Sequence, residues 1–335
     1  MSLMTVSIII CTRNRADSLK PTLESIGRAN VPSGWNVELL VVDNGSSDHT
    51  QAVVASTARL NNITLRYTHE PIAGLCHARN TGLRETSGQI ILFTDDDIRV
   101  PLNWINGMCQ PILDGNADAV AGGITFPPAT AAVLARPPYS SRRSWFASTE
   151  DLDRKSPAMM IGANMAFHRH VLERVPRFDI ELGPGALGFQ DETLFSQQLL
   201  AAGYKLVGAL EIMVEHHFDL SRLTQKGMID LARKMGRSHA FVFHHWDHKK
   251  SRLAFPRLVL SHLHRHWTRS FERINGKASG VISVPALQLE QKLAFYREYL
   301  AQRRRPHKYP PQNLTPSVSC ALEGFPGNAA RGHDR

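Results

Sequence analysis

The sequence predicts an α/β fold with a mostly parallel central sheet flanked by helices, followed by a basic helical extension. Three observations support this: short β-branched apolar runs alternate with helical patterns over the first 126 residues, polar clusters follow these runs, and basic residues are concentrated in the last third. With 335 residues, 42% hydrophobic and 21% charged, the chain can form one large α/β domain with an appendage. This composition excludes a small disulfide scaffold and a wholly disordered protein.

Four runs are expected to form strands: residues 6–10, 37–43, 63–69 and 89–94. The first is a continuous β-branched apolar run, typical of a strand buried on both faces. The first three are each followed by a helical pattern, and the apolar residues of these patterns include Leu19, Leu23, Ile26, Leu75, Ala78 and Leu83. Strands and helices at this spacing predict right-handed crossovers and a parallel sheet. Because ligands of such sheets bind beyond the carboxyl ends of the strands, we expect the functional site there.

Three successive carboxylates, Asp95, Asp96 and Asp97, directly follow the fourth strand. Their mutual repulsion is tolerated best where a cation neutralises it. A few hard oxygen ligands suit Mg²⁺ or Mn²⁺ that shares its remaining coordination with a diphosphate. The alternative is a solvated loop leading into a helix N-terminus, because Pro101 follows shortly.

Two further polar residues occupy positions suited to a nucleotide. Asp43 ends the second strand, where its carboxylate can accept a hydrogen bond from a base edge or can stabilise the turn before the next helix. Arg79 lies in the helix after the third strand, where it can reach an anionic or carbonyl group or remain solvated. Neither residue is specific alone.

The order of these segments along the chain is more specific than any one of them. SIIICTRNRADSL, VVDNGSSDHT and GLCHARNTGLRETSGQIILFTDDD are followed by GANM, FDIELGPGALGFQDETLFSQQLLAAGY and VEHHF. Over roughly residues 5–240 this order resembles the family 2 glycosyltransferases. The resemblance implies the GT-A fold, whose central sheet is Rossmann-like.

The resemblance also implies roles for the residues at the strand ends. Thr12, Arg13 and Asp43 would line the base and ribose pocket, and Arg79 would lie near the base. In the aspartate cluster, Asp95 would face the ribose or the metal, Asp96 would contribute to binding of the nucleotide-sugar, and Asp97 would hold the metal. His216 or His217 would make a further metal or diphosphate contact, and only one of these neighbours can point into the site from an extended segment.

In this family the general base belongs to a downstream acidic pair, usually Glu-Asp. Here the pair reads Gln190-Asp191, so the resemblance assigns the base to Asp191, and we expect Gln190 and Glu192 on the acceptor side. The alternative is a helix N-cap for the following amphipathic segment. The glycines of residues 183–188 predict a second mobile segment beside Asp191.

The resemblance implies an inverting transfer of a sugar from a UDP- or GDP-sugar, with Mn²⁺ or Mg²⁺, to a saccharide or lipid-linked acceptor. In such a reaction the divalent ion stabilises the leaving diphosphate and a carboxylate takes the proton of the acceptor hydroxyl. We expect a role in the synthesis of cell-surface polysaccharide or glycolipid. Neither the donor base nor the sugar nor the acceptor can be predicted from the sequence.

Four regions follow from this interpretation. Residues 1–126 form the nucleotide-sugar-binding half and residues 127–221 the acceptor and catalytic half of one domain, residues 222–305 a basic helical extension, and residues 306–335 a disordered tail. Between Pro127 and Pro157 the chain lacks periodicity and predicts an acceptor-side lid. Trp145 and Phe146 would stack on sugars there or anchor the loop to the core.

Residues 222–335 carry 21 Lys and Arg against 7 Asp and Glu, a net charge of +14 in a chain whose total is +9. Aromatic residues among these cations suit an interfacial helix on anionic lipid, and they suit packing on the catalytic domain almost as well. We therefore expect a cytoplasmic protein, peripheral on the inner face of the membrane. The sequence is also compatible with an oligomer.

Other classes fit less well. A sugar-phosphate nucleotidyltransferase needs a glycine-rich loop after the first strand, where this chain has CTRNRAD. A non-catalytic basic binding protein for nucleic acid would leave the acidic first two thirds unexplained, and no nucleic-acid-binding module is found. Cys11, Cys76, Cys109 and Cys320 lack metal-site spacing and predict reduced thiols. No apolar run is long enough to span a membrane.

Overall fold

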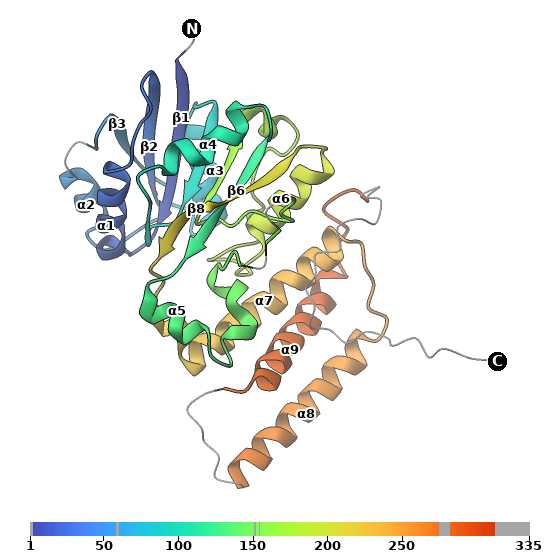
Figure 1. Ribbon diagram of the computed structural model, residues 1–335. Helices are drawn as coiled ribbons and strands as arrows, with labels where there is room; N and C mark the ends of the chain where they lie inside the picture. Colours follow the sequence, from blue (N-terminus) through green and yellow to red (C-terminus); the bar gives the residue numbers. More distant parts are fainter. Residues whose placement is uncertain (1–2, 58–59, 151, 154, 275–281, 312–335) are drawn as a thin grey trace.

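One mixed sheet organises the computed structural model, which describes residues 3–311 except 58–59, 151, 154 and 275–281. Within these residues the sheet has eight strands in the order β3-β2-β1-β4-β7-β6-β8-β5 (Figure 1). The strands are β1 Met4–Thr12, β2 Trp35–Asp43, β3 Ile63–His69, β4 Ile90–Thr94, β5 Ile98–Arg99, β6 Ala119–Thr125, β7 Met165–His168 and β8 Leu206–His216. All four strands predicted from the apolar runs are present.

The first half of the sheet is parallel, as predicted. β1 pairs in parallel with β2 and with β4, and β2 pairs in parallel with β3. In this register Thr12 lies opposite Asp43, so the polar residues at the ends of β1 and β2 meet at one edge. The second half is mixed, because β7 is antiparallel to β4 and β6, and β5 is antiparallel to β8.

Helices cover both faces of the sheet because alternate strand residues point to opposite sides. On one face Ile8 and Ile10 belong to a core with α1 Ala16–Gly27, α2 Thr50–Ser56 and α4 Trp104–Leu113. On the other face Ile9 belongs to a core with α3 Leu75–Glu85 and α6 Asp191–Ala201. The result is the three-layered GT-A arrangement that the sequence predicted.

The segment predicted to be an irregular lid contains short helices. Within residues 127–157 these are α5 Pro128–Leu134 and the 3₁₀ helix η1 Ser140–Phe146. Two further 3₁₀ helices, η2 Arg169–Glu173 and η3 Leu220–Leu223, flank α6 and β8 in the chain. Trp145 and Phe146 are 5% and 0% exposed and belong to the main core. The arrangement corresponds to the anchoring alternative, because neither ring presents a free face to a sugar.

The basic extension forms three helices: α7 Gln225–His245, α8 Ala254–Ile274 and α9 Val284–Gln302. Met228, Leu231 and Ala232 of α7 join the main core of the sheet. α9 packs along α7, and α8 packs on the other side of α9 (Figure 1). The extension therefore packs on the sheet domain through α7. No helix among the described residues is long and apolar enough to cross a membrane.

The tail differs in part from its prediction. Residues 306–311 pack on the domain, since Lys308 Nζ lies 2.7 Å from Asp179 Oδ1 and Tyr309 donates a hydrogen bond to the same carboxylate. These contacts make the beginning of the segment ordered despite its proline content. Residues 312–335, which include Cys320, lie outside the described residues. Cys11, Cys76 and Cys109 are free thiols.

Candidate active site

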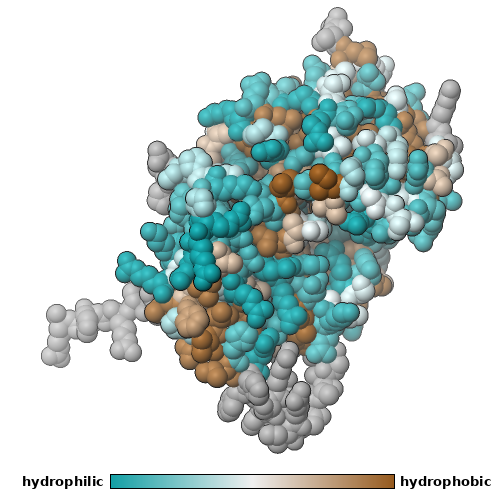
Figure 2. Space-filling view, turned by 180° about the vertical axis from the view of Figure 1, so that it is seen from behind, coloured by the Kyte–Doolittle hydropathy of each residue, from teal (hydrophilic) through white to brown (hydrophobic). Residues whose placement is uncertain are grey.

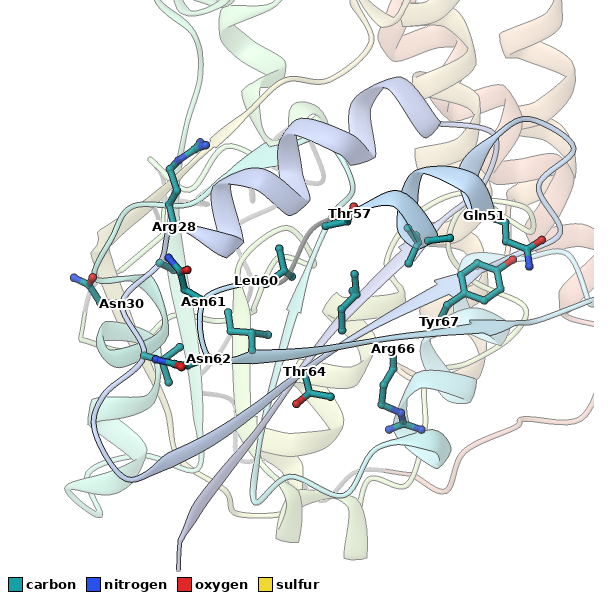
Figure 3. Close-up of a pocket in the computed structure, with 16 residues that line it drawn as sticks. Arg28, Asn30, Gln51, Thr57, Leu60, Asn61, Asn62, Thr64, Arg66 and Tyr67 are labelled. Carbon is teal, nitrogen blue, oxygen red and sulfur yellow. The ribbon is translucent and has the colours of Figure 1, made fainter.

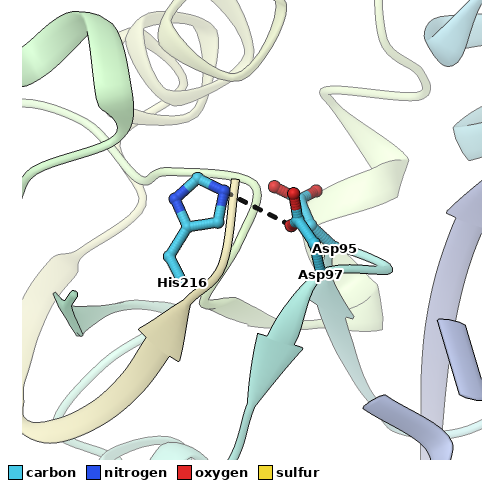
Figure 4. A group of neighbouring side chains, drawn as sticks. All are labelled: Asp95, Asp97 and His216. Atoms are coloured by element: carbon cyan, nitrogen blue, oxygen red, sulfur yellow. Dashed lines mark ion pairs between the residues drawn. The ribbon is translucent and has the colours of Figure 1, made fainter. Parts of the chain in front are cut away.

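The aspartate cluster lies at the end of β4, where the chain turns back into β5. Thr94, the last residue of β4, donates a hydrogen bond of 2.7 Å to the Ala163 carbonyl and holds the strand end in place. The antiparallel pair of β5 and β8 sets Ile98 opposite His216. One ligand atom each from Asp95, Asp97 and His216 therefore lie within 4.8 Å of one another (Figure 4).

The chemistry of these three side chains fits a divalent cation. Oδ1 of Asp97 is buried without a hydrogen-bond partner in the described part of the chain, and it lies 3.3 Å from Nε2 of His216. The other ring nitrogen of His216, Nδ1, lies 3.2 Å from the Phe146 carbonyl oxygen, which accepts its proton in that tautomer. Nε2 then presents a lone pair to the carboxylate, so a shared cation or a proton is needed between them.

His217, the neighbouring candidate, points elsewhere. Its Nε2 lies 2.6 Å from Glu215 Oε1 at the surface, whereas His216 is 3% exposed. The alternation of side chains along β8 explains this difference. Of the two histidines that the sequence left open, His216 is the one beside Asp95 and Asp97.

Arg15 is a charged residue of the cluster that the sequence interpretation missed. Its guanidinium forms ion pairs with Asp97 and, at 3.2 Å, with Asp96, whereas Arg13 is exposed to solvent. Both arginines follow β1, and only their positions relative to the start of α1 separate them. Residue 15 is the N-cap position of α1, and an arginine there gives no local signal of a helix start.

Charges within the cluster have opposed effects on its carboxyl groups. Burial raises the pKa of Asp96 to about 7, although Arg15 opposes this shift. Burial and the charge of Asp97 raise the pKa of Asp95. For Asp97, burial is outweighed by His216 and Arg15, which lower its pKa. Thr12 also donates a hydrogen bond of 2.6 Å to Asp96 Oδ2, so Asp96 is held by the protein itself.

Asp43 is buried at the end of β2 and both of its oxygens have partners. Oδ1 accepts a hydrogen bond of 2.8 Å from the Ser46 amide, and Oδ2 accepts one of 2.8 Å from the Tyr67 hydroxyl. Burial, followed by the bond to Asp43, raises the pKa of Tyr67 to about 12. The turn-stabilising role that the sequence offered as an alternative is therefore present, and each oxygen keeps a second lone pair.

Asp191 begins α6 and forms a buried ion pair with Arg79 of α3. The guanidinium lies 5.2 Å from the ring centre of Phe178, and the carboxylate of Glu192 approaches the same nitrogen to 3.7 Å. The structure thus brings Arg79 to Asp191 and Glu192. Arg79 is only 3% exposed and is enclosed by protein. Sequence reasoning missed this contact because 112 residues separate the partners.

Asp191 and the aspartate cluster both act electrostatically on one thiol, that of Cys11. The charges of Arg79, Asp95, Asp96 and Asp191 all act on Cys11, whose pKa is raised to about 12, chiefly by burial. Glu192 is less enclosed than Asp191, and burial together with the charge of Asp191 raises its pKa to about 8. The Gly162 amide donates a hydrogen bond of 3.4 Å to Glu192 Oε1, and the carbonyl of the next residue, Ala163, accepts the bond from Thr94, so Glu192 lies near the end of β4.

The loop before Asp191 requires glycine. Gly183 has φ of +77°, and a Cβ there would lie 3.0 Å from Asp191 Cγ. Gln190, predicted to lie on the acceptor side, is 8% exposed, and its amide nitrogen lies 4.0 Å from Met235 Sδ of α7. Gln190 therefore joins the loop to the helical extension, while Glu192 stays beside the site.

One large hollow among the described residues lies away from this site. A cavity of about 1480 Å³ lies between α1, α2 and β3, with Arg28, Leu60 and Tyr67 among its lining residues (Figure 3). It contains neither the aspartate cluster nor Asp191. Because residues on both sides of positions 58–59 line it, we assign it no role.

Comparison with known proteins gives a consistent result. The family model described as glycosyl transferase family 2 matches residues 7–175. Glycosyltransferase AglE of Haloferax volcanii is 27% identical over 215 residues, which are 63% of this chain and 66% of that protein. Succinoglycan biosynthesis protein ExoM of Rhizobium meliloti is 29% identical over 119 residues, 36% of this chain and 38% of that protein. The matches thus span less than two thirds of these relatives.

Solved structures share the fold. Mannosyltransferase PcManGT from Pyrobaculum calidifontis, in complex with GDP-Man and Mn²⁺, superimposes with a TM-score of 0.54 at 20% identity and covers 89% of this chain and 86% of its own. GalNAc-T7 with UDP, GalNAc and Mn²⁺ gives a TM-score of 0.53 at 14% identity and covers 90% and 57%. At these identities the likeness shows the fold alone.

Proposed function

Because the chain belongs to glycosyl transferase family 2, we propose that it transfers a sugar from a nucleoside-diphosphate sugar to a hydroxyl group of a saccharide or lipid-linked acceptor, with inversion at the anomeric carbon. The observation that carries this proposal is the pairing of two groups at one end of the sheet. One group, Asp95, Asp97 and His216, suits a divalent ion, and the other supplies a buried carboxylate, Asp191.

The residues at the ends of the strands would bind the sugar-nucleotide donor. Thr12, Arg13 and Asp43 would bind the base and ribose, and Asp95, Asp97 and His216 would hold Mn²⁺ or Mg²⁺. The bound ion would supply Lewis-acid stabilisation of the diphosphate that leaves. Arg15 already neutralises part of the carboxylate charge, so it would limit the repulsion between the aspartates and an incoming diphosphate.

The acceptor side follows from the start of α6. Asp191 would accept the proton of the acceptor hydroxyl as the new bond forms. Arg79 would hold the Asp191 carboxylate in one position, because its own guanidinium is buried and packs on the Phe178 ring. Glu192 would border the acceptor. We place the reaction on the cytoplasmic side, in synthesis of a cell-surface polysaccharide or glycolipid.

The test is a panel of sugar nucleotides, assayed for hydrolysis and transfer with Mn²⁺, with Mg²⁺ and with a chelator. We expect one donor to be consumed only with a divalent ion, and a nucleoside diphosphate with Mn²⁺ to raise the melting temperature. Stabilisation by a nucleoside triphosphate with release of pyrophosphate would instead indicate nucleotidyl transfer. Absence of any metal-dependent binding of nucleotide would overturn the proposal.

A further inference from the structure

The first half of α8 exposes a row of large apolar side chains. Phe255, Leu260 and Leu263 are 62%, 64% and 62% exposed, Leu253 just before the helix is 56% exposed, and Val259 is 41% exposed. Helical positions three or four residues apart lie on one face, so Phe255, Val259 and Leu263 form an apolar stripe, and Leu260, three residues before Leu263, widens it. Apolar side chains gather at the lower left of the molecule in Figure 2, where α8 lies.

This stripe is not the face by which α8 packs on the protein. The opposite side of α8 contacts α9, where Ala254 and Leu258 lie in a cluster with Phe295 and Tyr299. Arg265 reaches Glu290 of α9 at 3.5 Å from the same side. In Figure 1 α8 is the outermost of the three helices. The helix therefore has a core-facing side and a separate apolar side that faces outward.

Basic residues are concentrated in the part of the sequence that carries the stripe. Between Asp247 and Glu272 the chain has no acidic residue and six Lys and Arg. A surface hollow of about 340 Å³ at the start of α8 is lined by Lys250, Ser251, Arg252 and Arg257 together with Phe243 and Leu253. Within the described residues, the buried hydroxyl oxygen of Ser251 has no hydrogen-bond partner. Three cationic side chains thus line a hollow beside the apolar stripe.

We propose that this face docks the protein on an anionic phospholipid surface. The five apolar residues, Leu253, Phe255, Val259, Leu260 and Leu263, would enter the boundary between headgroups and acyl chains, and Lys250, Arg252 and Arg257 would bind a lipid phosphate in the hollow. Interfacial helices combine an apolar stripe with flanking cations in this way. This inference rests on the proposed function, because docking on the membrane would bring the active site to a lipid-linked acceptor.

The same charges argue against the other occupants of such a face. A second copy docked symmetrically through this stripe would bring two sets of unneutralised cations together. Nucleic acid would use the cations and leave the apolar stripe in water. An anionic bilayer satisfies both parts at once.

The packing of the extension connects this face to the active site. α9 lies between α8 and α7, and Ser238 of α7 accepts a hydrogen bond of 2.9 Å from the Phe189 amide. A Cβ on Gly188 would lie 2.5 Å from Lys234 of the same helix. The loop before Asp191 therefore packs on α7, which is joined through α9 to the helix that would contact the membrane.

The experiment is sedimentation of the full chain with vesicles, which needs no donor or acceptor. One set contains phosphatidylcholine alone and the other includes about one third phosphatidylglycerol. We expect at least about tenfold stronger partition to the anionic vesicles at low salt, and release in about 1 M salt, where the Debye length falls to roughly 3 Å. Inorganic phosphate serves as the free-ligand probe, and we expect it to displace the protein from anionic vesicles only at high concentration.

Two variants and two matched controls locate the contact. Leu260→Asp with Leu263→Asp, and separately Arg252→Glu with Arg257→Glu, should each reduce partition at least about tenfold. The controls Leu102→Asp and Lys20→Glu alter an equally exposed leucine and an exposed cation on the nucleotide-binding half, and should bind as the wild type does. Thermal unfolding of every variant verifies that each has folded.

Several outcomes would overturn the proposal. These are equal binding to both kinds of vesicle, no binding to either, equal loss in the controls, or tight phosphate binding that vesicles do not compete for. A dimer in light scattering that Leu260→Asp with Leu263→Asp dissociates would assign the stripe to a second copy. Vesicle binding without metal-dependent nucleotide binding would support this inference and refute the proposed function, and the reverse result would do the opposite.

Discussion

Arg79 of α3 and Asp191 of α6 form an ion pair in which the two side chains are only 4% and 1% exposed. The pair joins two segments that are 112 residues apart in sequence, and it fixes the carboxylate to which we assign the base. The same guanidinium is 3.7 Å from Glu192, so one cation serves two acids. Removing either partner leaves a buried charge without compensation, which makes the pair accessible to experiment.

Asp191→Asn should nearly abolish sugar transfer while leaving the affinity for nucleoside diphosphate within a few fold. The base acts on the acceptor hydroxyl, and the amide keeps the size of the side chain but cannot take the proton. Transfer rates and calorimetric affinities check the two halves of the prediction. The control is Asp114→Asn, an exposed aspartate at the end of α4. Full transfer by Asp191→Asn would refute the assignment.

Arg79→Met should reduce the free energy of unfolding by about 3–5 kcal/mol, because it leaves Asp191 buried and unpaired. The double variant Arg79→Met with Asp191→Leu should recover most of that loss, since both charges are gone. Urea unfolding of the two single variants and the double variant gives the coupling energy. If the losses of the two single variants simply add up to the loss of the double variant, the ion pair does not stabilise the fold.

Asp97→Ala and Asp95→Ala should each weaken Mn²⁺-dependent binding of a nucleoside diphosphate by at least about tenfold, because each removes a charged ligand. Binding without metal should change little. Calorimetry with and without Mn²⁺ distinguishes the two cases, with Asp114→Ala as the control. Unchanged affinity in Mn²⁺ would place the ion elsewhere.

Gly183→Ala should lower transfer more than Gly34→Ala, although both glycines have a positive φ, of +77° and +79°. Each substitution costs about 1 kcal/mol of backbone strain. A Cβ at Gly34 meets nothing within 4 Å, whereas one at Gly183 lies 3.0 Å from Asp191 Cγ. The two variants should therefore lose comparable free energy of unfolding. Only Gly183→Ala should also lower the transfer rate, by at least about tenfold. Equal rates in both variants would contradict the argument.

Glu181 should contribute stability that is lost in acid. Arg305 donates two hydrogen bonds to Glu181, of 2.6 and 2.9 Å, and together with Lys308 these lower its pKa from 4.5 to about 2. Since the folded-state pKa is depressed, the contribution is present above pH 4.5 and is lost as the pH falls from there toward 2.

Because the Glu181 side chain is 30% exposed, we expect no more than about 1 kcal/mol. Glu181→Gln should flatten the dependence of the unfolding free energy on pH in that window. Equal slopes for the variant and the wild type would show that the contact contributes nothing.

Local pattern was sufficient for the elements of the first half of the chain. The four apolar runs form β1 to β4, and the polar residues that follow β1, β2 and β4 meet because parallel strands end at one edge. Asp95 and Asp97 could thus be selected before any coordinates were known. The family was evident in the order of these segments, and the family model confirms it.

The sequence by itself determined the parallel first half of the sheet, the acidic strand ends and the excess of positive charge; the tertiary structure alone decided which side chains meet. The partners Arg79 and Asp191, or Asp97 and His216, come from distant segments, and no local periodicity encodes such a contact. The choice of Arg15 over Arg13 depends on how α1 starts. Likewise, Trp145 is buried and Leu260 is exposed because burial depends on which helix packs against which, and that is settled by the whole core.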